Sequence, residues 1–142
     1  MDIKNLVVVS GMQGVHKIVS PRGNGLIIED MITGKRKFVS IRKHQFSPLE
    51  SIAVFTDDGE STELKNVFRN MLDQLEDNPP ISPKSSSAEL REYFLDILPN
   101  HDQDRVHDND IKKIISWFTF LNKLDYWKQE DKEAETKKEK KE

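Results

Sequence analysis

A dense group of potential metal ligands occupies residues 101–110, which read HDQDRVHDND and hold two histidines and four aspartates. Imidazole nitrogens and carboxylate oxygens are ligands that zinc and calcium take in proteins. A calcium loop of the EF-hand type requires glycine at its sixth position and glutamate at its twelfth, but a count from Asp102 reaches His107 and Lys113. Neither histidine has the H-E-x-x-H spacing of a zinc-binding helix. The spacing therefore favours a structural loop, and we expect no metal and no cofactor.

The same segment has the composition of a helix start. The apolar residues that follow it recur at helical spacing: Ile111, Ile114, Ile115, Phe118 and Leu121. Asp108, Asn109 and Asp110 come directly before this stripe, and such side chains accept hydrogen bonds from the free N–H groups of a first helical turn. Val106 is placed to pack back on that turn. We predict that these aspartates cap a helix.

Other residues that could do chemistry stand alone. His16 and His44 have no serine, cysteine or carboxylate at a recognised catalytic spacing, and the chain contains no cysteine at all. Residues 23–25, Gly-Asn-Gly, lack the Lys-Ser/Thr pair and the following helix of a phosphate-binding loop. We therefore expect no catalytic residue, and a protein that works by binding and not as an enzyme.

The first third of the chain carries the signals of short antiparallel strands. Apolar and β-branched residues gather in residues 15–20, 25–31, 35–40 and 51–55. Residues 21–25, PRGNG, and the Thr33-Gly34 pair have the composition of hairpin turns. Short strands joined by such turns predict a small SH3-like antiparallel β-barrel or curled sheet.

The rest of the chain has a helical period. Apolar residues from Leu64 to Leu75 form one stripe of a helix that we expect to begin near Ser61 and to stop before Pro79. Ser86 and Glu89 fit a capping box at the start of a second helix, which Pro99 ends. The predicted class is α+β, a β module followed by about three helices. Its parts are a β module (1–60), a connecting helix (61–78), a linker (79–87), a helical module (88–127) and a disordered charged tail (128–142).

Charge divides the chain into unlike halves. Residues 1–55 contain eight Lys or Arg against four Asp or Glu, whereas residues 56–127 contain eight against fifteen. Six cations fall in a stretch of twenty-two residues inside the predicted β module, with Phe38 between them and Phe46 three residues further on: Arg22, Lys35, Arg36, Lys37, Arg42 and Lys43. Small barrels that expose cations and rings bind nucleic acid through phosphate contacts and base stacking. We predict RNA or DNA binding by these six residues, with a merely solvated hairpin and edge strand as the alternative.

The aromatic residues at the end of the last helix suggest a second kind of function. Tyr126 and Trp127 come just before the charged tail, and large aromatic side chains often anchor protein partners. The alternative function is therefore a protein–protein adaptor that uses the helical module and these two residues. The apolar run Leu6–Val9 is too short for a signal peptide or a membrane span, so we expect a cytoplasmic protein with no membrane partner.

Three stretches resemble a family of small Bacteroidota proteins with a domain of unknown function. They are VSGMQGVHKIVS at residues 9–20, residues 49–56, and residues 86–121, where DQDRV is followed by DIKKIISWF. The resemblance covers most of the chain before the tail. It implies a bacterial cytoplasmic protein with an N-terminal β-rich module and a C-terminal helical one, and it implies no activity.

Overall fold

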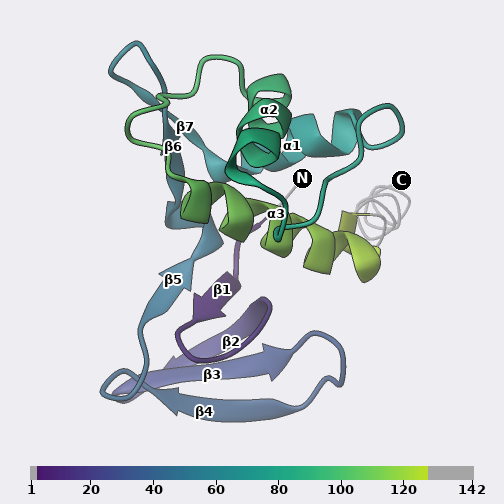
Figure 1. Ribbon diagram of the computed structural model, residues 1–142. Coiled ribbons are helices and arrows are strands. Elements are labelled where there is room, and N and C mark those ends of the chain that lie inside the picture. The colour runs from purple at the N-terminus through teal and green to yellow at the C-terminus, as the bar shows by residue number, and fades with distance from the viewer. Residues whose placement is uncertain (1–2, 128–142) are drawn as a thin grey trace, which may run out of the picture.

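The computed structural model describes residues 3–127, and the predicted disordered tail at 128–142 lies outside this range. An antiparallel sheet of five strands comes first (Figure 1): β1 (Leu6–Val9), β2 (His16–Arg22), β3 (Gly25–Asp30), β4 (Arg36–Ser40) and β5 (Phe46–Pro48). A 3₁₀ turn, η1 (Leu49–Ser51), leads to a hairpin of β6 (Ala53–Phe55) and β7 (Ser61–Glu63). The helices follow: α1 (Leu64–Asp73), α2 (Ser87–Ile97) and α3 (Asp108–Lys123). The predicted α+β class is confirmed.

The main sheet is curled and open. Its strand order is β4-β3-β2-β1-β5, so β4 and β5 are edges that do not pair with each other. A β-bulge between Ile18 and Ser20 adds local twist to β2. The structure thus has the curled sheet of the two predicted forms, not a closed barrel. β1 was not predicted as a strand because it is buried on both faces and lacks the alternation that marks a half-exposed strand.

β1 joins two hydrophobic cores because its successive side chains point to opposite faces. Leu6 and Val8 pack with the large cluster under the helices, whereas Val7 and Val9 pack with a small cluster on the inner face of the sheet. Burial of both side-chain sets makes this strand the structural link between sheet and helices. The inner face is defined by the small cluster and the partly buried residues around it: Val7, Val9, Met12, Ile18, Leu26, Ile28, Val39 and Phe46.

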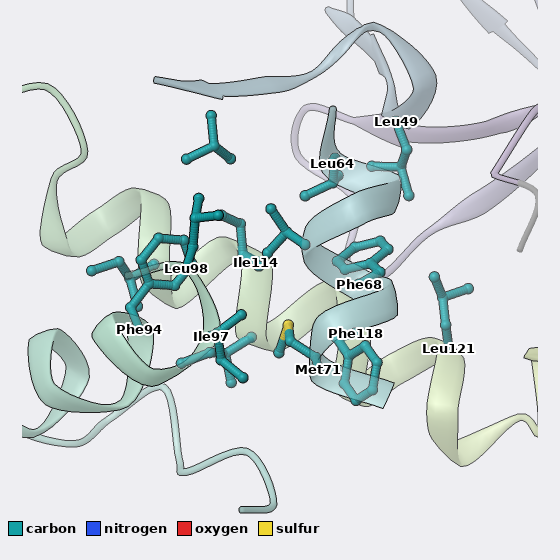
Figure 2. Packing of buried hydrophobic residues seen from close by; sticks show 14 of the residues in the cluster. Leu49, Leu64, Phe68, Met71, Phe94, Ile97, Leu98, Ile114, Phe118 and Leu121 are labelled. Atoms are coloured by element: carbon teal, nitrogen blue, oxygen red, sulfur yellow. The ribbon is translucent and has the colours of Figure 1, made fainter. Parts of the chain in front are cut away.

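The three helices share the large core (Figure 2). The stripe predicted for α1 supplies Val67, Phe68 and Met71, and α2 and α3 add Phe94 and Phe118, all buried. The rings of Phe68 and Phe118 lie 5.9 Å apart, which is within the range of favourable tilted contacts. α1 begins three residues later than expected, because residues 61–63 pair with β6 as a strand. Within residues 3–127, no helix combines the length and apolar run needed to cross a bilayer.

Candidate nucleic-acid interface

Residues 101–110, HDQDRVHDND, make hydrogen bonds that stabilise their own loop and the helix start. His101 is buried, and its Nδ1 lies 2.7 Å from the carbonyl oxygen of Leu98, to which it can donate. The Asp102 carboxylate accepts from the backbone N–H groups of Asp104 at 2.9 Å and Arg105 at 3.3 Å. Such bonds turn the carboxylate inward on its own loop. In the part of the chain that the structure describes, no three histidine, aspartate or glutamate side chains converge as metal ligands do.

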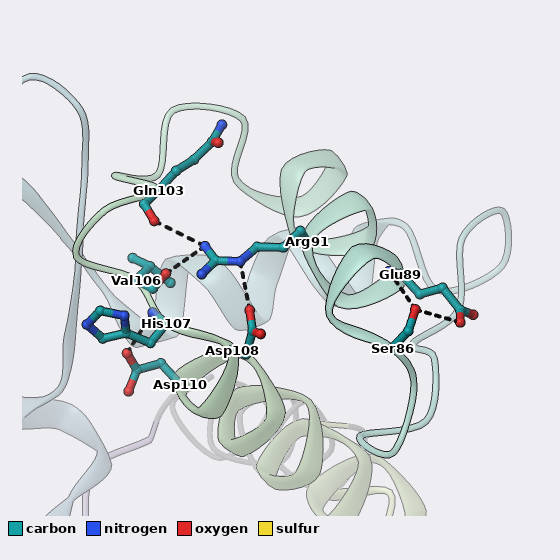
Figure 3. A network of polar contacts seen from close by, with 8 residues as sticks. All are labelled: Ser86, Glu89, Arg91, Gln103, Val106, His107, Asp108 and Asp110. Atoms are coloured by element: carbon teal, nitrogen blue, oxygen red, sulfur yellow. Dashed lines mark hydrogen bonds and ion pairs between the residues drawn. The ribbon is translucent and has the colours of Figure 1, made fainter.

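The predicted helix cap is present in a modified form (Figure 3). His107 takes the N-cap position of α3, and its backbone N–H donates to the Asp110 carboxylate at 3.0 Å. At the start of α2, the Ser86 hydroxyl accepts from the N–H of Glu89 at 3.2 Å and donates to its carboxylate at 2.9 Å. Both acidic residues also suit the positive end of a helix dipole. Asp108 and Asp110 therefore serve the start of α3, whereas Asp102 serves the loop before it.

The six predicted cations do not form one patch. β3 and β4 pair with Ile28 opposite Lys37 and Glu29 opposite Arg36. Because directly opposed residues point to the same face, Lys37 shares the inner face with buried Ile28, whereas Arg36 points to the other side. Arg36 is also partly neutralised, since its Nε lies 3.1 Å from the Glu29 carboxylate. Lys35 is exposed on the turn before β4.

The other side of β2, β3 and β4 forms an exposed surface that we call the outer face. Figure 1 places these strands at the end of the molecule away from the helices. Its pairs set rows across the three strands, with Arg22, Gly25 and Ser40 in one row and Ile27 beside Phe38 in the next. The outer face consists of Lys17, Ser20, Arg22, Gly25, Ile27, Glu29, Arg36, Phe38 and Ser40. Phe38, at its centre, keeps 48% of its surface exposed.

An open hollow of about 520 Å³ lies at the hairpin end of the outer face. Its lining is two arginines, a ring and small polar residues: Arg22, Gly23, Asn24, Phe38, Ser40 and Arg42. The structure thus brings together two of the six predicted cations beside Phe38. Asn24 and Ser40 were not predicted as site residues, although the expected hairpins alone would have placed Ser40 opposite the start of β3. Lys43 follows in the same turn, exposed and outside the hollow.

Two turns hold the hollow in shape. Gly23, with a φ of 55°, makes the tight β2–β3 connection. The turn after β4 is fastened to it, since the N–H of Ile41 donates to the carbonyl oxygen of Asn24 at 2.8 Å. Within that turn the N–H of Arg42 donates to the Ser40 hydroxyl at 3.1 Å. These bonds bring Arg42 to the same end of the sheet as Arg22.

Trp127 is a core residue, which corrects its predicted role as a surface anchor. Only 5% of its surface is exposed, and its ring lies 5.9 Å from that of Phe68 and 5.8 Å from that of Phe118. The apolar stripe of α3 continues past the helix end, so the indole covers the helical core instead of projecting from it. Tyr126 is half-buried and packs edge-on against Trp127 at 5.2 Å.

These features define an α+β protein with an open antiparallel sheet that exposes one face and a helical part that buries the main core. Residues 3–49 match the family model of a domain of unknown function, DUF5606, and residues 52–121 match that of another, DUF6852. The two matches meet at η1.

A solution NMR structure of a protein from Bacteroides vulgatus is similar to this chain. The two share 34% sequence identity over 84% of this chain and 85% of that one, with a TM-score of 0.68. The chain belongs to the family of this Bacteroides protein. In this chain, the region that matches DUF5606 precedes the region that matches DUF6852. The predicted membership of a family with domains of unknown function is therefore confirmed. No curated protein matches the sequence.

Proposed function

We propose that this protein associates with nucleic acid through the outer face of β2, β3 and β4, as a cytoplasmic binding protein and not as an enzyme. The observation that carries the proposal is the position of Phe38, a half-exposed ring beside a hollow that Arg22 and Arg42 line. Exposed rings stack on bases, and arginines contact phosphates, so the two chemistries that a polynucleotide offers are met at one place.

The positions of the six predicted cations indicate which of them could contact phosphate. Arg22 and Arg42 are the main phosphate contacts. Arg36 lies on the same face about 13 Å from Ser40, the length of four strand residues, and its ion pair with Glu29 reduces its attraction for phosphate. Lys37 points to the inner face, so we assign it a minor share. Lys35 and Lys43 sit on flanking turns and add to the local positive potential.

A salt-dependent titration tests the proposal. Fluorescently labelled RNA and DNA are titrated at several salt concentrations, and the affinity of the wild type is expected to fall steeply as salt rises. The double variant R22E/R42E should bind more weakly and show a smaller salt slope. K84E/K123E is the matched control, because it makes the same charge change at exposed lysines of the helical part. No binding to either polymer at low salt would remove the proposal.

A groove between the sheet and α3 supports the alternative of a protein adaptor. Two adjoining hollows of about 190 and 500 Å³ share Ile52, Asp110, Lys113 and Trp117. Phe55 at the edge is 46% exposed, and the Arg105 guanidinium lies 5.2 Å above its ring. An adaptor would be supported by a protein partner that survives nuclease treatment and is lost with a charged residue in place of Phe55.

A further inference from the structure

We infer that the hollow beside Phe38 binds an unpaired base, so that the ligand of the outer face is a single-stranded stretch of nucleic acid. The inference rests on the proposed function and adds the strand state of the ligand and the residues that recognise it. Three features of the hollow support it: the half-exposed ring of Phe38, side chains that can hydrogen-bond to a base, and arginines on two sides.

The ring of Phe38 packs against the backbone of Gly25, where a side chain would leave it no room. A Cβ atom built on Gly25, across the strand pair, would lie 2.9 Å from two carbon atoms of the ring and would overlap the carbonyl oxygen of Val39. The ring therefore rests against the bare backbone of Gly25, and the 48% of Phe38 that stays exposed faces solvent. Contact with the Gly25 backbone limits the positions of the ring before a base binds, which lowers the entropy cost of stacking.

The polar residues around the ring can read the edge of a base. Ser40 accepts from the N–H of Arg42 through its oxygen, which leaves its hydroxyl hydrogen to donate. The Asn24 side chain carries both amide donors and a carbonyl acceptor, while its backbone carbonyl is fixed by Ile41. The Watson–Crick edge of a base offers matching groups only when the base is unpaired.

The cations suit a strand that passes over the ring. Arg22 comes from the end of β2, and Arg42 comes from the turn after β4, so they reach the hollow from different segments. Phosphates on either side of a bound nucleotide would meet one arginine each. In a duplex the base faces are stacked and the Watson–Crick edges are paired, so Phe38 would find no base face and the two polar side chains could reach only groove edges.

The rival binding mode is docking of the β2–β3 hairpin into a duplex groove, since a two-stranded ribbon fits the major groove of B-DNA. The two binding modes predict different effects of removing the Phe38 ring. Stacking on a free base depends on the ring, whereas groove docking depends on the charges and on the shape of the hairpin.

The test compares the affinities for single-stranded and double-stranded probes, in variants that keep or remove the aromatic ring of Phe38. Labelled 12-nucleotide RNA and DNA probes are titrated as single strands and as duplexes with wild type, F38A and F38Y. We expect the wild type to prefer single strands. F38A should lose roughly 5- to 150-fold in single-strand affinity with its salt slope unchanged, and F38Y should stay near wild type because it keeps the ring. V19A is the control, since Val19 is an exposed apolar residue on β2 outside the hollow.

A second measurement reads the stack directly. In F38W the new indole fluorescence should be quenched when a single strand binds, while V19W should show no such change. Equal binding of single and double strands would overturn the inference and leave the proposed function standing. A normal affinity of F38A would overturn the inference too, and would leave of the proposed function only charge-driven binding through Arg22 and Arg42. Absence of binding to every probe at low salt would instead remove the proposed function, so the two failures are distinguishable.

Discussion

The guanidinium of Arg91 on α2 lies 2.8 Å from the carboxylate of Asp108 at the start of α3 (Figure 3). The same guanidinium donates to the carbonyl oxygens of Val106 at 2.7 Å and Gln103 at 3.2 Å. One side chain thus closes the loop between two helices and occupies the carbonyls that precede α3. Hydrogen bonds of this kind hold a loop better than an exposed ion pair would by itself.

Removal of Arg91 should destabilise the helical part. In R91A the carbonyl oxygens of Val106 and Gln103 lose their donor, and we expect the free energy of unfolding to fall by about 1–3 kcal/mol. Urea titration followed by circular dichroism measures this change. K113A is the control, because Lys113 is an exposed residue of α3. Equal stability of R91A and K113A would show that the network contributes nothing.

The Asp108 carboxylate should make stability depend on pH in the acid range. A hydrogen bond from Ser87, followed by the bond and charge of Arg91, lowers the pKa of Asp108 below its ordinary value of 3.8. Because the folded state holds the proton less tightly than the unfolded state, the stabilisation is complete above the unfolded pKa and is lost as the pH falls through the folded pKa.

The variant D108N isolates this effect. Unfolding free energies of the wild type and D108N are compared from pH 7 down to pH 2, and the difference in favour of the wild type should shrink as the pH falls below about 4. The exposed residue Asp104 gives the control D104N, whose difference from the wild type should not follow this course. A constant difference between wild type and D108N across the range would contradict the assignment.

Trp127 should stabilise the core although it follows the last helix. Its indole packs against Phe68 and Phe118 and is almost fully buried. We expect W127A to lose about 3–5 kcal/mol of unfolding free energy and W127F to lose less, since the smaller ring keeps part of the contact. L95A is the control, because Leu95 is 42% exposed. Thermal unfolding in which W127A behaves like L95A would show that Trp127 is a surface residue after all.

The sequence alone determined the local features of this protein. The apolar stripe of α1, the Ser86 cap of α2, the start of α3 and the two hairpin turns all depend on residues close together in the chain. Spacing and turn chemistry report such features because the interacting groups lie within a few residues of one another. The interpretation of HDQDRVHDND as a helix start succeeded for the same reason.

Only the tertiary structure decided which residues share a surface. Arg36 and Lys37 point to opposite faces in any strand, but only the register with β3 decided that Lys37 shares the inner face with Ile28. Arg22 and Arg42 are twenty residues apart and meet through the bond between Ile41 and Asn24. Trp127 is buried because α1 and α3 supply rings around it. Register and burial depend on contacts between distant segments, and composition carries no record of these contacts.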